Sequence, residues 1–337
     1  MKRLAGLAAA SLALGCHGMK LDQVMKASPA NLSAVKDVAK DQGAANRMQK
    51  QCDVIARREP DIQEETALGG AVALNWIQGS GGLLLDKRAG TAALNRYLNA
   101  VGKNLAAQSA RPTLSWTFGV LKADAFNAVS APAGYVFVAK GLLEQVENEA
   151  QLAGVLGHEI AHVTERHALE TYRRLLVEPC ESEVLARRGR TLSKEVGGAV
   201  LELAPEELQT VLSLGQSAGQ ALDLDDNWKL LGKLTEGTVK RLRESGFSKD
   251  DEFESDRIAV ELMLSAGYDP DEYVRFLGKI PEKNGLFTAH PGNASRQKKL
   301  REWLDDAKAK EGEFSTLPAS RAALVKVPLK AELAIVK

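Results

Sequence analysis

The sequence predicts an α+β fold in which helices predominate around a small β-sheet. Apolar residues recur at three- and four-residue spacing over most of the chain, which predicts amphipathic helices. Two short segments in the first half are rich in alternating β-formers, which predicts two strands. The chain has 337 residues, so a single domain can bury a sizeable core.

Composition excludes several classes of protein. Lys+Arg and Asp+Glu both number 44, so the chain lacks the basic surface of a nucleic-acid-binding protein. No internal stretch approaches the roughly 18 apolar residues that a membrane-spanning helix needs. The three cysteines are too few for a disulfide-rich scaffold.

The N-terminus is typical of an export signal. An apolar run, Leu4–Gly15, follows two basic residues and is too short to cross a membrane. It ends in small residues before Cys16 and so resembles a bacterial lipobox, although Ala13 stands where Leu is usual. We expect residues 1–15 to be a signal peptide and Cys16 to carry a lipid that anchors the protein to the outer membrane in the periplasm. An ordinary secretory peptide with an incidental cysteine is the alternative.

Residues 16–60 are polar and alanine-rich with weak periodicity, which predicts a tether with fraying helix. From Asp61 the pattern tightens and no linker interrupts it, so we expect one domain over residues 61–310 and a C-terminal tail over 311–337. Cys52 and Cys180 are candidates for one disulfide, because the predicted compartment is oxidising. Two unpaired thiols are the alternative.

The elements of the predicted domain follow from local patterns. Glycines break the first helix, and a proline follows the second. Alternating β-formers mark the first strand, and the second strand follows a Pro-Ala-Gly turn. The expected elements are a helix from Ile62 towards Ile77, a helix over Leu94–Leu105, strands at Thr113–Leu121 and Gly134–Ala139, and helices from Glu147 to Asp306.

The pattern His158-Glu159-Ile160-Ala161-His162 indicates a metal site. Residues four apart share one face of a helix, so both imidazoles can reach one ion. Zinc suits nitrogen ligands with one open position, and it lowers the pKa of a bound water to about 7. Glu159 is then placed to take the proton of that water and pass it to a leaving amine.

A third ligand has to come from another part of the chain. Glu252 and Asp256 share one helical face, so Glu252 can complete the site while Asp256 orients a ligand histidine. A solvated acidic face is the alternative. Glu181 stands nearer in sequence, but its surroundings make a poor buried helix. His167 lies about 140° around a continuous helix from His162, so we expect it at the surface or behind the ligands.

These motifs together resemble metallopeptidase family forty-eight, the gluzincin group that includes HtpX, the CAAX prenyl endopeptidases and soluble periplasmic BepA-like members. The resemblance runs from about Asp61 to about Leu304 and is nearest to the periplasmic members, because no internal membrane span is predicted. The segments that carry it are His158–His162, Glu252 with Asp256, Ala266–Pro270, Asn127-Ala128, Pro132–Val138, Gly141–Leu143, and His290-Pro291 with Arg296.

The resemblance implies a zincin-like domain with one Zn²⁺ per chain. His158, His162 and Glu252 would bind the ion, and Glu159 would be the general base. His290 matches a histidine that either stabilises the oxyanion or caps the zinc.

Three further implications concern the surroundings of the zinc. Arg296 is expected to anchor the loop of His290 or Asp256. A strand comprising Tyr135, Val136, Phe137 and Val138 is expected to border the cleft and to pair with extended peptides through an exposed edge. Two departures from the family pattern, Ala133 and Ala289, affect the turn before this strand and the surroundings of His290.

The function that follows is zinc-dependent cleavage of polypeptides, above all misfolded or misassembled proteins of the bacterial envelope. A chaperone-like assembly factor for outer-membrane proteins, with a latent zinc site, is the alternative. The intact Glu159 favours the enzyme, because a structural zinc site needs no base.

Overall fold

The structure, a computed structural model, describes residues 29–85, 89–188, 202–216, 222–223, 227–280, 290 and 293–314. The chain divides into two compact units, one within residues 1–59 and 174–220 and the other within 60–173 and 221–337. These boundaries differ from the predicted domain of residues 61–310, because 174–220 group with the N-terminal segment. Cys16, the predicted signal peptide and residues 315–337 of the predicted tail lie outside the described residues.

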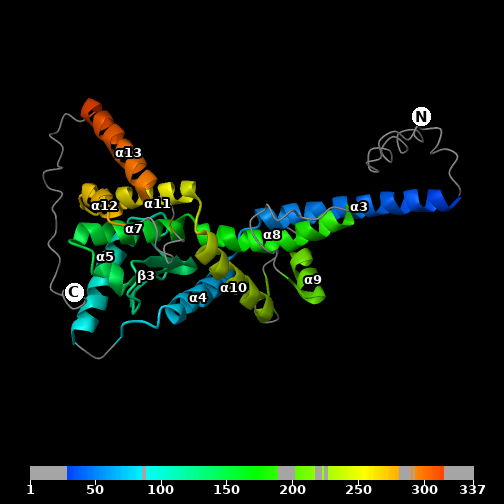
Figure 1. The fold of residues 1–337 in the computed structure, drawn as a ribbon, viewed down its shortest axis with the longest axis horizontal. Coiled ribbons are helices and arrows are strands. Elements are labelled where there is room, and N and C mark those ends of the chain that lie inside the picture. The colour runs from blue at the N-terminus through cyan, green and yellow to red at the C-terminus, as the bar shows by residue number, and fades with distance from the viewer. Residues whose placement is uncertain are drawn as a thin grey trace. The chain divides into compact units, whose positions relative to one another are not determined.

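The first unit contains α3 (Pro29–Arg57), the C-terminal part of α8 (His167–Arg187) and α9 (Pro205–Leu214) (Figure 1). The 29-residue α3 occupies the segment predicted as a tether. Its buried residues Ala45, Cys52 and Ile55 share one face, so this part of the helix packs against other elements. Cys52 and Cys180 form a disulfide between α3 and α8, with their Cα atoms 5.7 Å apart.

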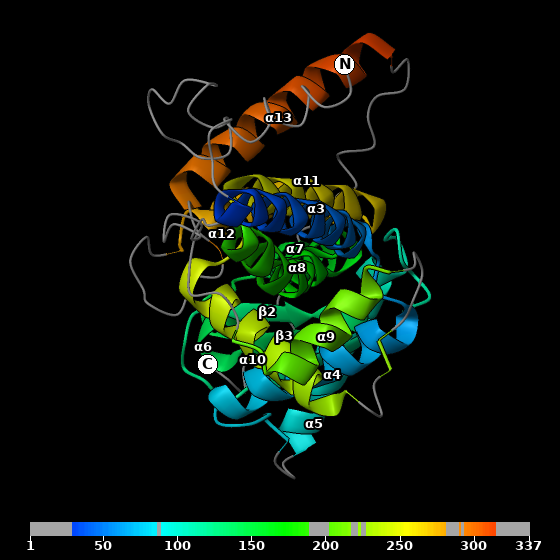
Figure 2. The same ribbon diagram turned by 90° about the vertical axis from the view of Figure 1, so that its right-hand side faces the viewer.

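The second unit is a layered α+β structure, which confirms the predicted fold class. Helix α7 packs against α11 on one side and against β2 and β3 on the other (Figures 1 and 2). The elements of this unit are α4 (Ile62–Gly79), α5 (Ala89–Ala106), β1 (Thr117–Leu121), β2 (Ala128–Ala131), η1 (Pro132–Gly134), β3 (Tyr135–Ala139), α6 (Lys140–Leu143), α7 (Glu149–Thr164), α10 (Trp228–Ser245), α11 (Lys249–Ser265), α12 (Pro270–Leu277) and α13 (Asn293–Phe314).

The sheet has three strands in the order β1-β3-β2. β3 pairs in parallel with β1 and antiparallel with β2, so Val138 lies opposite Val120 on one side and Ala128 on the other. The prediction of an exposed edge at Tyr135–Val138 is therefore wrong, because β3 is hydrogen-bonded along both sides. Among the described residues, β2 is the sheet edge beside α7.

A residue of α4, Glu65, holds the turn between β2 and β3 in place. Ala133 adopts a left-handed backbone conformation, φ 63°, inside η1. Its N–H donates to Glu65 Oε1 at 3.2 Å, and Arg111 donates to both oxygens of the same carboxylate at 2.7 and 2.8 Å. Gly69 allows the close approach, because a Cβ there would lie 2.2 Å from the carbonyl oxygen of Pro132. α4 thereby fixes the end of the edge strand.

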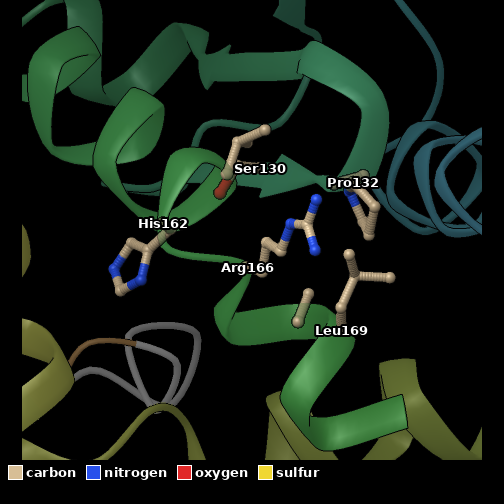
Figure 3. Close-up of a pocket in the computed structure, with 8 residues that line it drawn as sticks. Ser130, Pro132, His162, Arg166 and Leu169 are labelled. Atoms are coloured by element: carbon tan, nitrogen blue, oxygen red, sulfur yellow. The ribbon is translucent and has the colours of Figure 1, made fainter. Parts of the chain in front are cut away.

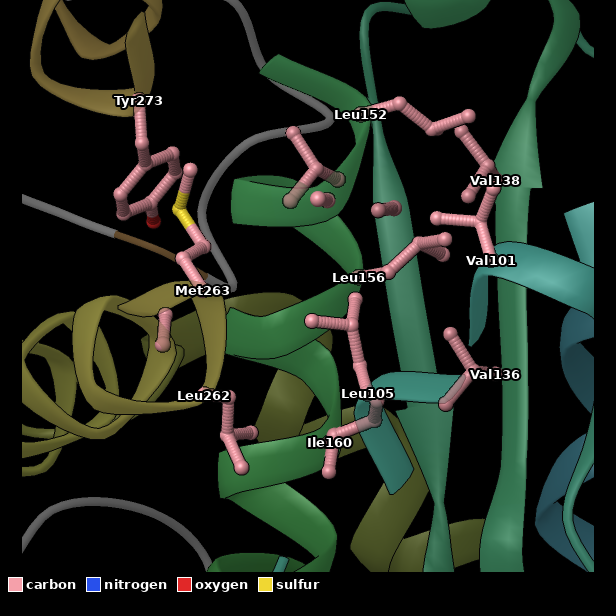
Figure 4. Close-up of a cluster of buried hydrophobic side chains, with 14 of the residues drawn as sticks. Val101, Leu105, Val136, Val138, Leu152, Leu156, Ile160, Leu262, Met263 and Tyr273 are labelled. Carbon is pink, nitrogen blue, oxygen red and sulfur yellow. The ribbon is translucent and has the colours of Figure 1, made fainter. Parts of the chain in front are cut away.

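The hydrophobic core of this unit surrounds α7. Leu152, Leu156 and Ile160 point from α7 towards the sheet and α5, while Met263 and Tyr273 approach from the opposite side (Figure 4). Every residue of α7 is buried, so its polar side chains are shielded from bulk solvent. Within the part of the chain that the structure covers, no helix combines the length and hydropathy of a membrane span.

Candidate metal centre

Helix α7 carries three of the predicted site residues, His158, Glu159 and His162. The helix begins at an N-cap, Asn148, whose side chain accepts a hydrogen bond from the N–H of Gln151 at 2.9 Å. All three site residues are buried, with exposed fractions of 4%, 2% and 2%. Helical spacing therefore delivers both imidazoles and the carboxylate to one enclosed region, as the sequence predicts.

Helix α11 brings Glu252 and Asp256 to the same region. A reciprocal capping box starts the helix: Ser248 Oγ accepts from the N–H of Asp251, and Asp251 Oδ2 accepts from the N–H of Ser248, each at 3.1 Å. α11 can approach α7 closely because a Cβ on Gly157 would lie only 3.2 Å from the Cα of Ala259. Both acidic residues are fully buried, unlike a solvated acidic face.

Four side chains meet in a cluster that could hold a metal ion: His158, His162, Glu252 and His290. One donor atom from each lies within 4.8 Å of all the others. The Nε2 atoms of His158 and His162 are 3.0 Å apart, and Glu252 Oε1 is 3.4 Å from His162 Nε2. Ligands of one zinc ion are separated by similar distances, since each bond is about 2.0–2.2 Å long.

Asp256 lies behind this cluster and orients His158. Its Oδ1 is 2.9 Å from His158 Nδ1 and accepts a hydrogen bond from the Tyr273 hydroxyl at 2.8 Å. Arg296 donates to both oxygens of Asp256 at 2.7 and 2.6 Å and lies 2.7 Å from Glu252 Oε2. Arg296 thus contacts both buried carboxylates, which includes the contact with Asp256 that the sequence predicts.

Electrostatics keep both acidic groups ionised. Burial raises the pKa of Asp256, but the charge and hydrogen bonds of Arg296 and the hydrogen bond of His158 outweigh it and lower the pKa to about 2. Burial likewise opposes ionisation of Glu252, and the charges of His290 and Arg296 hold its pKa well below the usual range. Glu252 is therefore an anion, which is the form that a divalent cation requires of a carboxylate ligand. Asp256 is an anion that can accept a hydrogen bond from His158.

The pKa values of the two imidazoles of α7 are shifted in opposite directions. Burial and the charge of Arg296 lower the pKa of His158, but hydrogen bonds to Asp256 and Glu252 outweigh them and raise it to about 9. Burial holds the pKa of His162 well below its usual range, despite the hydrogen bond with Glu252. The carboxylate partner on Nδ1 accounts for the difference.

His290 is buried beside the cluster and contacts two of the candidate metal ligands as well as Glu159. Its Nδ1 is 2.9 Å from Glu252 Oε1 and 3.2 Å from His158 Nε2, and its Nε2 is 3.3 Å from Glu159 Oε1. The other oxygen of Glu159, Oε2, is buried and has no hydrogen-bond partner among the described residues. Ala289 and Pro291, which flank His290, lie outside the described residues.

Two small pockets adjoin the cluster along β2. Ser130 and Pro132 line the first together with His162 and Arg166 (Figure 3). Ala128 lines the second beside His158, Glu159 and His290, along with apolar residues: Phe126, Leu142, Val155, Phe276 and Ile280. The edge strand therefore runs past the cluster from one pocket to the other.

Sequence reasoning missed part of the surroundings of His162. Phe247 stacks on its ring at a centroid distance of 4.1 Å, and its Nδ1 lies 2.8 Å from His167 Nδ1 and 3.3 Å from Ser255 Oγ. The angle predicted for His167 assumed a continuous helix, whereas α7 ends at Thr164. His167 is buried and lies behind the ligands, one of its two predicted locations.

The known proteins that resemble this chain match the part of it that contains the site. The model of peptidase family M48 matches residues 92–304, which confirms the resemblance seen in the sequence. Beta-barrel assembly-enhancing protease of Yersinia pestis is 25% identical over 233 residues, covering 68% of this chain and 40% of the relative. The protein of that name from Escherichia coli (strain K12) is 26% identical over 204 residues, covering 60% and 35%. Mitochondrial metalloendopeptidase OMA1 of Schizosaccharomyces pombe is 26% identical over 221 residues, covering 64% and 54%. The chain thus spans about a third to a half of the length of these relatives.

Proposed function

This chain belongs to peptidase family M48, and from that premise we propose that it is a zinc-dependent endopeptidase that cleaves proteins of the bacterial envelope. One observation carries the proposal: four buried donor atoms of His158, His162, Glu252 and His290 converge within 4.8 Å of one another, beside the carboxylate of Glu159. A site of plain structural histidines would not need a buried carboxylate with a free oxygen.

The donor set suits zinc. Two imidazole nitrogens and one carboxylate, from His158, His162 and Glu252, are the ligand types of catalytic zinc sites that keep one position open. When bound, zinc supplies a Lewis acid that polarises a carbonyl group and lowers the pKa of water. Asp256 and Arg296 hold the ligands in place before the ion arrives, so little reorganisation is needed.

Glu159 is the proposed general base. Its Oε2 is buried and lacks a hydrogen-bond partner among the described residues, so it is free to accept a proton from the attacking water. The same oxygen then returns the proton to the leaving nitrogen as the peptide bond breaks. His290 Nε2 lies 3.3 Å from Glu159 Oε1, and its proposed role is to donate a hydrogen bond to the developing oxyanion.

An extended polypeptide is the proposed substrate, paired with the side of β2 that has no strand partner among the described residues. The strand contributes lining residues to both pockets beside the cluster, so a chain laid along it would pass Glu159. Main-chain pairing of this kind gives low sequence selectivity. The bacterial relatives are named for β-barrel assembly, and this name, together with the predicted lipid anchor at Cys16, supports proteins of the bacterial envelope as the substrates.

A second candidate function is chaperone-like assembly of outer-membrane proteins with a latent zinc site. The observation that favours it is the position of His290, whose Nδ1 lies 2.9 Å from Glu252 Oε1 and 3.2 Å from His158 Nε2. An imidazole held there would take the open position of the metal.

Cleavage of unfolded casein by the full chain tests the proposal. We expect activity in the wild-type protein, loss on chelation, and a fall of about 10²–10⁴-fold in Glu159→Gln with zinc still bound. Glu302→Gln, an exposed glutamate 64% accessible at its side chain, is the matched control and should cleave as the wild type does.

The outcomes separate the two functions. Equal cleavage by Glu159→Gln and the wild type would show the mechanism to be wrong. Failure of the wild type to cut any unfolded protein, combined with suppression of client aggregation, would favour the assembly factor.

A further inference from the structure

We infer that His167 is a positioning residue for the metal ligand His162. It accepts the hydrogen bond of the Nδ1–H group of His162 and so holds that imidazole in the tautomer that presents Nε2 to the ion. This inference rests on the proposed function, because it requires an ion between His158, His162 and Glu252.

The first argument is the direction of the His162 ring. Its Nε2 lies 3.0 Å from His158 Nε2 and 3.4 Å from Glu252 Oε1, so this nitrogen faces the cluster. Its Nδ1 faces the other way and lies 2.8 Å from His167 Nδ1. An imidazole that binds a metal through Nε2 carries its proton on Nδ1, and that N–H needs an acceptor.

The second argument is the tautomer that His167 must adopt. Its Nδ1 can accept only when the proton resides on Nε2. That Nε2 lies 3.8 Å from Asp251 Oδ1 and 3.9 Å from Glu254 Oε2. Two negative charges on that side favour the N–H there and leave the Nδ1 lone pair for His162.

The third argument is the backbone that brings His167 into position. On an uninterrupted helix, His167 would lie about 140° from His162. Instead α7 ends at Thr164, Arg166 adopts φ 60°, and α8 begins at His167. The left-handed conformation of Arg166 turns the chain between the two helices, so that His167 comes to lie beside His162.

The two ligand histidines thus have matching support. Asp256 Oδ1 lies 2.9 Å from Nδ1 of His158, and His167 has the corresponding place on His162. Ser255 Oγ also approaches His162 Nδ1, but at 3.3 Å the contact is longer. His167 is therefore the principal acceptor.

Three substitutions of His167 separate hydrogen bonding from packing. In His167→Asn, Oδ1 is as many bonds from the Cα atom as the Nδ1 it replaces, so it can accept from His162. In His167→Gln the oxygen is one bond further away, and His167→Leu fills the space without an acceptor. Comparison of Asn with Gln remains decisive even where Leu prevents folding.

The measurement is the Zn²⁺ dissociation constant of the full chain by competition with a chromophoric chelator. The visible spectrum of the Co²⁺-loaded protein gives a second readout. We expect about 10–100-fold weaker zinc binding and altered cobalt bands for Leu and Gln, and near wild-type values for Asn. Urea unfolding of the metal-free variants checks that the fold is intact.

The outcomes distinguish failure of this inference from failure of the proposed function. Equal zinc affinity in all three variants overturns the role of His167 and leaves the proposed function standing. An Asn variant as weak as Leu overturns it too, because packing alone would then explain the loss. A wild-type chain that binds no zinc overturns the proposed function itself.

Discussion

Arg296 is the residue on which the charge balance of the metal centre depends. It bridges Asp256 and Glu252 with three contacts of 2.6–2.7 Å, and both carboxylates are fully buried. Burial of an unpaired carboxylate is costly, so the guanidinium stabilises both anions in the metal-free protein. Its planar fork meets both oxygens of Asp256 at once, which an ammonium group cannot do.

Substitution of Arg296 should therefore destabilise the metal-free protein. We expect Arg296→Met to lower the free energy of unfolding by about 3–5 kcal/mol, because two buried charges lose their partner. The unfolding free energy of Arg296→Lys should lie between those of Arg296→Met and the wild type, since lysine keeps the charge but not the planar guanidinium group. Urea denaturation in the presence of a chelator measures the difference, and an unchanged midpoint in Met would contradict this account.

At the scale of single residues, the sequence predicts the parts of the site that helical periodicity controls. The i,i+4 spacing of His158 and His162, and of Glu252 and Asp256, is a local property of each helix. The direct contact of His167 with His162 was not predicted, because Arg166 is not a residue type that signals a left-handed turn. Contacts to His290 and Arg296 were suggested only by resemblance, since they join segments far apart in the chain.

Among the elements, α12 stabilises the start of α7. Glu272 accepts hydrogen bonds from Asn148 at 2.9 Å and from Gln151 at 3.1 Å, and it pairs with Arg275. Burial raises the pKa of Glu272, but these partners outweigh it and lower the pKa to about 2, from an ordinary value of 4.5. The carboxylate thus ties the N-cap of the metal-binding helix to its neighbour.

This depressed pKa predicts a specific pH dependence. Because the folded state holds the anion, the contribution of Glu272 is complete above about pH 4.5 and is lost as the pH falls towards 2. We expect Glu272→Gln to lose on the order of 1–2 kcal/mol of unfolding free energy at pH 7, after allowance for solvent screening. Urea unfolding from pH 7 to pH 3 measures it, with Glu261→Gln as the control. A difference that stays constant or grows at acid pH would refute the assignment.

The elements themselves were predictable to the extent that their patterns are local. α4 and α5 follow the predicted periodicity, and β3 covers nearly the predicted strand. β2 was missed because Ala128-Val129-Ser130-Ala131 has no alternation of apolar and polar residues. Strand order is set by pairing between distant segments, so the central position of β3 could not be derived from its own sequence.

For the molecule as a whole, the disulfide belongs to one of the two compact units. Cys52 and Cys180 are 128 positions apart in the chain, yet both lie within the unit that contains α3 and α9. A cross-link between such distant positions restricts the unfolded chain strongly. The boundaries of this unit were hard to predict from the sequence, since the unit combines two segments that are far apart in the chain.

Reduction should consequently weaken this unit selectively. We expect reductant, or the double variant Cys52→Ser with Cys180→Ser, to lower its unfolding free energy by about 2–4 kcal/mol. Zinc affinity should be unchanged, because every proposed ligand lies in the other unit. Circular dichroism during denaturation and zinc titration provide the two measurements. Detection of two free thiols in the protein by mass spectrometry would contradict the disulfide on which this prediction depends.

The shortness of β2 sets a thermodynamic threshold for what the proposed enzyme can attack. The strand has four residues, and only alternate residues of an edge strand direct their main-chain groups outward. At roughly 0.5–1.5 kcal/mol per hydrogen bond, pairing supplies only a few kcal/mol. Folded domains are held by about 5–15 kcal/mol, so such pairing cannot extract a segment from an intact protein. Under the proposed function, a client's own loss of stability would decide whether it is cut.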